Sequence, residues 1–364
     1  MPIFAWSRPF PRMKIYACIP AAVLLFAMAL SQVQAQDFAD AQTTPPVIHQ
    51  TGIIRVNPAQ DSSAKTALTP IPEFVHHQTD AMTKPDTASS LLVDWSAIYI
   101  NPPLMTSASM TMTVAQQFPG GRIMGWYPYA AMTTSDSVTW KNLQIGVPAD
   151  GLETTHPQWM TARQVEKAAT IFLEKPVPAG LHKGDVGTTE GDVFLFARGN
   201  LAGVPPLACH CRLQRGISSG TENMISIKAT ADLKPWPESL AWSWIVLPQK
   251  SGSLQYRRIP IPSPGAETTT LTAILPAGSR PGISLSNDLR DEIIETLAGN
   301  RLNADEALAT SRLVIEIAEH SDTPLLIYPA PESWIAEKMP ITIKGNAKVA
   351  SRLFLLVEPV CKAD

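Results

Sequence analysis

Three cysteines have the residue type and spacing that could bind a metal or form a disulfide: Cys209, Cys211 and Cys361. In a strand, Cys209 and Cys211 point to one side and His210 points to the other. Two thiolates on one side, with Cys361 as a third ligand, could bind a soft metal ion such as Cu(I). The alternative is one structural disulfide from Cys361 to either strand cysteine, which leaves a buried thiol. The pattern favours the disulfide, so we predict no metal and no cofactor.

A hydroxyl nucleophile is suggested by GISSG at 216–220, which matches the pattern G-x-S-x-G. That chemistry needs Ser218 on a sharp turn between a strand and a helix. Here a polar loop and the strand-like segment NMISIKAT follow, so a hairpin loop is the better interpretation. Acids are plentiful, but nothing in their pattern selects a carboxylate pair that could hydrolyse a polymer. We therefore predict no catalytic residue.

Two further polar segments combine possible metal ligands. HHQTD contains His76, His77 and Asp80, but it lies in a stretch without periodicity, where adjacent histidines are not preorganised for a metal. GDVGTTEGD at 184–192 gathers acids among glycines without the regular spacing of a calcium loop. A hairpin turn is the favoured interpretation of this second segment.

The segment WYPY at 126–129 places three aromatic side chains and a proline in four positions. In a strand, Trp126 and Pro128 point one way and Tyr127 and Tyr129 point the other. Large aromatic side chains are mostly buried, so part of this segment is expected to pack in the core. The remainder could stack on a sugar ring or on a proline of a partner. Trp126 and Tyr127 are therefore candidate ligand-binding residues.

The first 35 residues have the pattern of a secretory signal peptide. The apolar run CIPAAVLLFAMAL is preceded by three basic residues, Arg8, Arg12 and Lys14. That run has about a dozen residues, which is too short to span a membrane. SQVQAQ then supplies small residues for cleavage before Gln36. We expect a periplasmic or secreted protein with no transmembrane segment after signal cleavage.

The charge of the chain argues against nucleic acid as a partner. The formal net charge is −3, and loss of the three basic leader residues makes it −6. No run of five or more basic residues occurs. Binding to nucleic acid depends on basic residues that neutralise phosphates. The expected partner is instead an envelope protein or a glycan.

The elements that must position these residues form a tether and two structured regions. Residues 36–88 are rich in Pro and Thr and lack periodicity, which predicts a tether with room for a short strand at GIIRV. Residues 89–280 contain many short strand-like segments, such as SMTMTV, separated by Gly, Pro, Asn and Asp. This pattern is typical of a mainly β protein with an antiparallel β-sandwich-like domain.

Residues 281–364 are expected to form a smaller α+β segment with a helix pair at 286–312. The first helix has an apolar stripe at every fourth residue, formed by Leu289, Ile293 and Leu297. Asn303 and Glu306 have the spacing of a capping box, which predicts the start of a second, short helix. RLVIEIAE at 312–319 alternates and predicts a strand, with its inward residues at Leu313, Ile315 and Ile317.

The chain resembles a family of exported bacterial proteins. The resemblance is carried by the order of GWYPYA, VTWKNLQI, MTARQVEKAATIFL and DVFLFARGNLAGVPPL, then a helix pair and LLIYPAPESWIAEKMPITI. Members share a Trp-Tyr-Pro segment, a strand with Trp and a basic residue, and a Phe-Leu-Phe-x-Arg-Gly strand. The family has no assigned activity, so the resemblance implies an exported domain over residues 90–345 and no catalytic residue. The family's Trp-rich stretch after the helix pair is absent from SRLVIEIAEHSDTP.

If Arg163, Glu166 and Arg198 are shared features of that family, the resemblance implies an ion network between strands. Buried charges are normally paired, which favours a structural role. The alternative is a site for an anion or a carboxylate. Arg163 and Arg198 therefore join the two aromatic residues as candidate ligand-binding residues.

The sequence as a whole predicts an exported, non-catalytic binding or accessory protein associated with the cell envelope. An exported hydrolase of cell-wall or extracellular polymers is the first alternative. A periplasmic metal-handling protein that uses the three cysteines is the second alternative.

Overall fold

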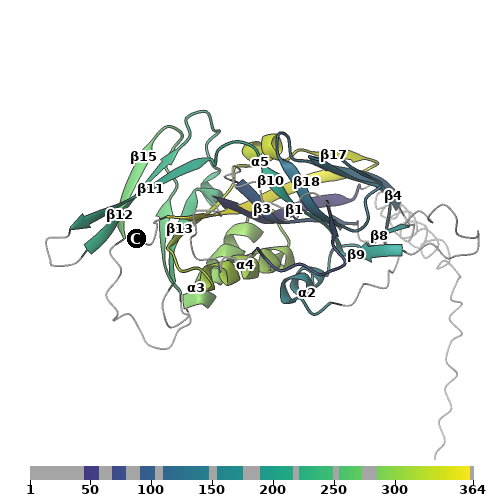
Figure 1. The fold of residues 1–364 in the computed structure, drawn as a ribbon, viewed down its shortest axis with the longest axis horizontal. Coiled ribbons are helices and arrows are strands. Elements are labelled where there is room, and N and C mark those ends of the chain that lie inside the picture. Colours follow the sequence, from purple (N-terminus) through teal and green to yellow (C-terminus); the bar gives the residue numbers. More distant parts are fainter. Residues whose placement is uncertain are drawn as a thin grey trace, which may run out of the picture. The chain divides into compact units, whose positions relative to one another are not determined.

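The computed structural model describes residues 45–56, 68–78, 91–102, 110–146, 154–174, 189–215, 221–248, 254–272 and 285–360. Within these ranges the side chains at 174, 211–215, 221–224, 268–272 and 285 are not described. The chain is mainly β, as the sequence predicted, with several sheets and a smaller helical part (Figure 1). No described helix is long and apolar enough to cross a membrane. The predicted signal peptide lies outside the described residues.

The largest sheet has nine strands. These are β1 (Val47–Val56), β2 (His76–His77), β3 (Leu91–Asn101), β5 (Arg122–Tyr127), β10 (Phe194–Leu201), β13 (Trp242–Pro248), β14 (Leu254–Pro260), β16 (Leu325–Pro329) and β18 (Lys348–Pro359). Their order across the sheet is β14-β13-β16-β18-β1-β3-β10-β5-β2. β1 and β18 run parallel, and the other neighbours are antiparallel.

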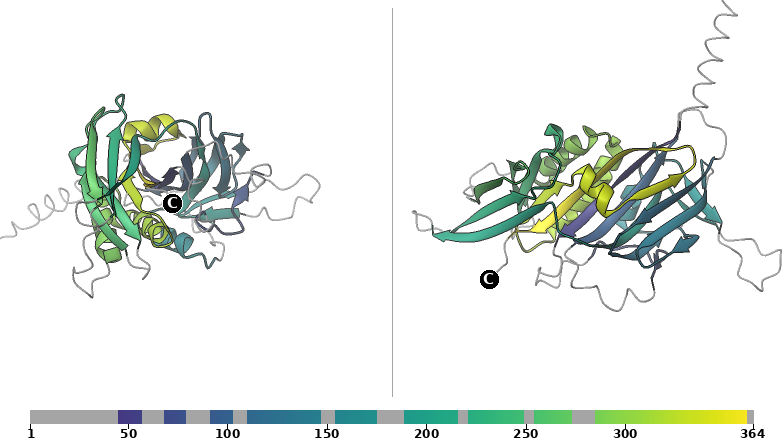
Figure 2. Two further views of the ribbon diagram at one scale, coloured as in Figure 1. Left: turned by 60° about the vertical axis from the view of Figure 1, so that its left-hand side comes forward. Right: turned by 90° about the horizontal axis from the view of Figure 1, so that it is seen from above.

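The other described strands form two smaller sheets. A six-stranded sheet contains β4 (Met110–Gln117), β6 (Met132–Thr133), β7 (Ser137–Ile145), β8 (Ile171–Glu174), β9 (Thr189–Asp192) and β17 (Ile341–Lys344). Its order is β17-β4-β7-β8-β9, and β6 pairs with β7. A three-stranded sheet contains β11 (Leu207–Arg215), β12 (Thr221–Ala229) and β15 (Glu267–Thr272), which lie side by side in both views of Figure 2.

β1 lies inside the range 36–88, for which the sequence predicted a tether with room for a short strand. It is a ten-residue strand with β18 on one side and β3 on the other, and nine of its residues are buried. Its apolar β-branched side chains favour a strand, whereas the Pro- and Thr-rich flanks hide the signal in the composition. β16 and β18 also bring residues of 281–364 into the same sheet as strands from 89–280.

The described residues form four α-helices: α2 (Pro157–Arg163), α3 (Leu285–Ala298), α4 (Ala304–Glu319) and α5 (Glu332–Lys338). A 3-10 turn, η2, spans Glu238–Leu240. α3 and α4 form the predicted helix pair. α4 starts as predicted, because the backbone N–H of Asn303 donates to Glu306 Oε2 at 2.8 Å in a capping box.

The strand predicted at 312–319 is wrong, because this segment is the second half of α4. Leu313, Ile315 and Ile317 are all buried, as the alternation required, but Val314 between them is buried too. A helix that is buried on several sides shows no polar face to reveal its period. The local alternation therefore could not distinguish helix from strand.

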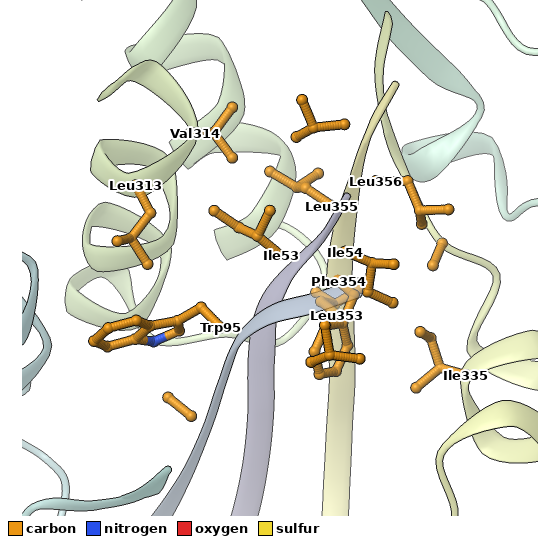
Figure 3. Packing of buried hydrophobic residues seen from close by; sticks show 14 of the residues in the cluster. Ile53, Ile54, Trp95, Leu313, Val314, Ile335, Leu353, Phe354, Leu355 and Leu356 are labelled. Atoms are coloured by element: carbon orange, nitrogen blue, oxygen red, sulfur yellow. The ribbon is translucent and has the colours of Figure 1, made fainter. Parts of the chain in front are cut away.

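The two faces of the central strands are covered by different helices. Ile53 lies beside Leu355, and Ile54 beside Leu356, across the β1–β18 pair. In Figure 3, Ile53 and Leu355 point toward α4, whereas Ile54 and Leu356 point toward the side where Ile335 of α5 lies. Alternate side chains along these strands thus fill two separate layers of the core.

Candidate functional site

The candidate site forms where the edge strand β2 meets β5. His76 lies opposite Trp126 in the antiparallel β2–β5 pair. Glu190 comes from β9, the edge strand of the six-stranded sheet. Its Oε2 lies 2.7 Å from His76 Nε2 and accepts a 2.6 Å hydrogen bond from the backbone N–H of Tyr129. One carboxylate therefore fixes an imidazole and the backbone next to an aromatic side chain.

The rings of Trp126 and Tyr129 lie beside the His76 ring, and we call His76, Trp126 and Tyr129 the aromatic surface. The rings of His76 and Trp126 are stacked with centroids 6.1 Å apart, and Tyr129 meets His76 edge-on at 5.8 Å. All three residues are only partly buried, and 25% of the His76 side chain is exposed. Partly exposed, oriented rings can stack on a ligand.

Tyr127 lies under the aromatic surface and is fully buried. Its hydroxyl donates to the carbonyl of Gly191 at 3.2 Å, and its ring packs 4.8 Å from Phe74 and 5.6 Å from Trp159. Burial, Asp192 and Glu190 raise its pKa. A neutral, buried phenol supports the rings above it and is not itself available to a ligand at the surface.

Arg163, at the end of α2, is held by Asp192. Its Nε and Nη2 donate to Asp192 Oδ2 at 2.9 and 2.7 Å. Trp159 Nε1 donates to the same oxygen at 2.8 Å. Arg163 is partly buried and Asp192 is almost fully buried, so this pair fastens α2 to β9.

Glu190 and Asp192 are two residues apart on β9, so their side chains point to the same side of the strand. Both carboxylates are buried. Glu190 binds His76 and Tyr129, whereas Asp192 binds Arg163 and Trp159. Hydrogen bonds and ion pairs with fixed protein groups give both carboxylates a structural role at the base of the aromatic surface.

Arg198 belongs to a separate buried cluster. Only 5% of its surface is exposed, its Nη2 lies 2.8 Å from Asp94 Oδ1, and its Nε donates to the Asp94 carbonyl at 2.9 Å. Arg55 Nε and Thr69 Oγ1 donate to Asp94 Oδ2 at 2.8 and 2.7 Å. Burial disfavours the Asp94 carboxylate, but Arg198 and Arg55 outweigh it and lower the Asp94 pKa.

The four predicted ligand-binding residues therefore do not share one surface. Trp126 belongs to the aromatic surface. Tyr127 is buried beneath it, and Arg163 is bound to Asp192. Arg198 is buried on the neighbouring strand β10, opposite Gly125. The ion network expected for Arg163, Glu166 and Arg198 is divided between Asp192 and Asp94. Glu166 is exposed, and its backbone N–H donates to Asp305.

Sequence reasoning missed two members of the site. His76 was placed in a tether, and Glu190 was interpreted as part of a turn. The alternating acids of T-E-G-D in β9 were the available signal, because buried acids normally mark an ion pair. Asp80 and Asp185, the other acids of those two segments, lie outside the described residues.

Among the described residues, Cys209 is a partly buried thiol that forms no disulfide. Burial and the nearby Glu358 raise its pKa, which disfavours the thiolate that a metal requires. Cys361, the side chain of Cys211 and the GISSG segment lie outside the described residues, so the disulfide and three-thiolate alternatives stay predictions. Within the described ranges, no group of three or more His, Cys, Asp or Glu could hold a metal ion.

Comparison with known proteins adds little to this geometry. No protein-family model and no curated protein matches the chain. Among solved structures, it is similar to the Mu homology domain of Fcho1 from Danio rerio, solved with a bound Eps15 peptide. The match covers 88% of this chain and 97% of that chain, with a TM-score of 0.37 and 7% sequence identity. At this TM-score we draw no conclusion from the similarity.

Proposed function

We propose that the protein is an exported, non-catalytic binding or accessory protein of the cell envelope. Its partner, an envelope protein or a glycan, docks on the aromatic surface of His76, Trp126 and Tyr129. The observation that supports this most directly is the pair of hydrogen bonds that Glu190 Oε2 forms, one with His76 Nε2 and one with the backbone N–H of Tyr129. That carboxylate fixes the His76 ring, beside which the rings of Trp126 and Tyr129 lie, before any partner arrives.

Preorganisation of this kind favours binding for a physical reason. A side chain that is already fixed loses little conformational freedom when a partner packs on it. Aromatic side chains are enriched in protein interfaces because they bury a large area and lose few rotamers. The hydrogen bonds of Glu190 and the stacked rings supply that rigidity at the edge of the nine-stranded sheet.

Co-purification after mild crosslinking in the native envelope tests the proposal. The full-length, tagged protein is compared with a Trp126→Ala/Tyr129→Ala variant. Trp242→Ala is the matched control, because Trp242 is also a partly buried strand tryptophan and its ring stacks on Arg258 at 4.4 Å. We expect a discrete partner that is retained by the control and lost by the double variant.

Two results would contradict the proposal. Equal recovery of the partner with the double variant would remove the aromatic surface from binding. Turnover of a cell-wall polymer by the purified protein, abolished when particular acids are substituted, would favour the hydrolase alternative.

A further inference from the structure

Among the described residues, the outer edge of β2 has a backbone position with no strand beside it. The N–H of Gln78 donates to the carbonyl of Met124 at 3.3 Å, and His77 lies opposite Gly125 in the register. In an antiparallel pair, hydrogen-bonded and non-hydrogen-bonded residue pairs alternate. The N–H and C=O of His77 therefore point away from β5. No described residue forms a hydrogen bond with either group.

The register also puts two unpaired side-chain atoms on one side of this edge. Trp126 lies opposite His76, and Gln78 continues the same register opposite Met124, so the four side chains share a face. Trp126 Nε1 and Gln78 Oε1 are buried and have no hydrogen-bond partner among the described residues. One is a donor and the other an acceptor. Unpaired buried polar groups are unfavourable, and a partner that reaches them would relieve this.

We propose that an extended segment of a polypeptide partner adds to the sheet as a strand beyond β2 and pairs with the N–H and C=O of His77. The inference depends on the proposed function, since it names the class of partner for the same surface. A strand presents its own N–H and C=O at the spacing that this edge requires. A polar side chain on this face of the added strand would lie next to Gln78, with Trp126 one strand further into the sheet.

Two variants of one residue separate backbone pairing from side-chain contact. His77→Pro removes the outward N–H, and proline is tolerated at an edge strand where that N–H faces away from the sheet. His76, which would precede the proline, is already in a strand, the conformation such a residue prefers. His77→Ala is the matched control, because it removes the imidazole and keeps the N–H.

The probe is an acetylated and amidated Thr-Val-Thr-Val-Thr peptide, which favours an extended chain. Its twin carries N-methyl groups on alternate amides and cannot pair along one edge. Binding is followed by NMR of the full mature protein through the indole N–H signal of Trp126. The indole N–H groups of Trp140, Trp159 and Trp244 are internal references, because they are bonded to Pro128, Asp192 and Glu292.

We expect the peptide to shift the Trp126 signal and leave the three references in place. His77→Ala should bind it as the unmodified protein does, whereas His77→Pro should bind at least about tenfold more weakly. The N-methylated twin should cause no shift. This last comparison needs no variant, so it holds even if His77→Pro does not fold.

Three outcomes would overturn strand addition. The first is equal binding of the peptide and its N-methylated twin. The second is a Trp126 shift with a chitin oligosaccharide and none with the peptide, which would identify a glycan partner. The third is no shift with any probe. The proposed function fails separately, when the Trp126→Ala/Tyr129→Ala variant keeps its envelope partner.

Discussion

His76 Nε2 and Glu190 Oε2 lie 2.7 Å apart and join the edges of two sheets. His76 belongs to β2, at the end of the nine-stranded sheet, and Glu190 belongs to β9, at the end of the six-stranded sheet. The same Glu190 oxygen accepts from the backbone of Tyr129. The pair therefore links the edges of the two sheets and holds the aromatic surface where they meet.

Glu190→Gln should weaken this link between the two sheets and lower the stability of the protein. Glu190 is almost fully buried, and a neutral amide forms weaker hydrogen bonds than a carboxylate, so the substitution should lower the free energy of unfolding by about 1–3 kcal/mol. Urea unfolding measures the change. Glu337→Gln is the control, because the Glu337 side chain is 71% exposed beside Lys338 and should change stability little. Equal effects of the two substitutions would contradict a structural role for Glu190.

Asp94→Asn should destabilise the protein more than any exposed substitution. Asp94 is fully buried, and its carboxylate is bound by Arg198, Arg55 and Thr69. Loss of the negative charge removes the carboxylate that two buried guanidinium groups share, which should cost about 3–5 kcal/mol. Thermal and urea unfolding report the loss. Asp291→Asn, in an exposed pair with Arg290, should change stability by less than about 0.5 kcal/mol.

Asn303→Ala should weaken the start of α4. Asn303 is the residue before the helix, in a capping box with Glu306. Loss of such a cap costs about 1 kcal/mol. Because α4 packs on β1, global unfolding in urea should detect the change. An unchanged unfolding midpoint would show that the cap is dispensable here.

Glu358 should make stability fall as pH rises. It is 5% exposed, its Oε2 has no partner among the described residues, and burial raises its pKa from 4.5 to about 8. Between these values the unfolded chain has released the proton and the folded protein keeps it. The free energy of unfolding therefore loses up to about 1.4 kcal/mol per pH unit from this group.

Unfolding in urea at several pH values from about 5 to 8 tests this, with Glu358→Gln for comparison. The glutamine variant lacks a titrating group at this position. Subtraction of its pH profile from that of the unmodified protein isolates the Glu358 contribution. Parallel profiles would show that Glu358 is ionised in the folded protein at neutral pH.

The sequence predicts the mainly β fold and the start of the second helix of the pair for a clear reason. Short strands separated by turn residues, and the Asn303–Glu306 cap, are local signals that lie within a few residues of each other. The ten-residue β1 is harder to predict, because its pairing with β18 is a contact across 300 residues of chain. Burial on several sides likewise hides the helical period of 312–319.

The candidate site shows the same limit. Trp126 was a candidate from residue type alone, and in the structure it is partly exposed. Tyr127 is its neighbour in sequence but lies in the core, and Arg198 forms a buried ion pair with Asp94. The bonds from Glu190 to His76 and Tyr129 join residues 114 and 61 positions apart. No local pattern contains such pairs.

Photo-crosslinking from one defined position tests the central claim most directly. A photoreactive phenylalanine analogue replaces Tyr129 in one strain and Val204 in another. Val204 is 66% exposed in the loop before β11, and the adjacent Gly203 lies beside Lys338 of α5. The account predicts a discrete adduct with an envelope partner from position 129 and none from position 204. An adduct from position 204 with none from position 129 would contradict it.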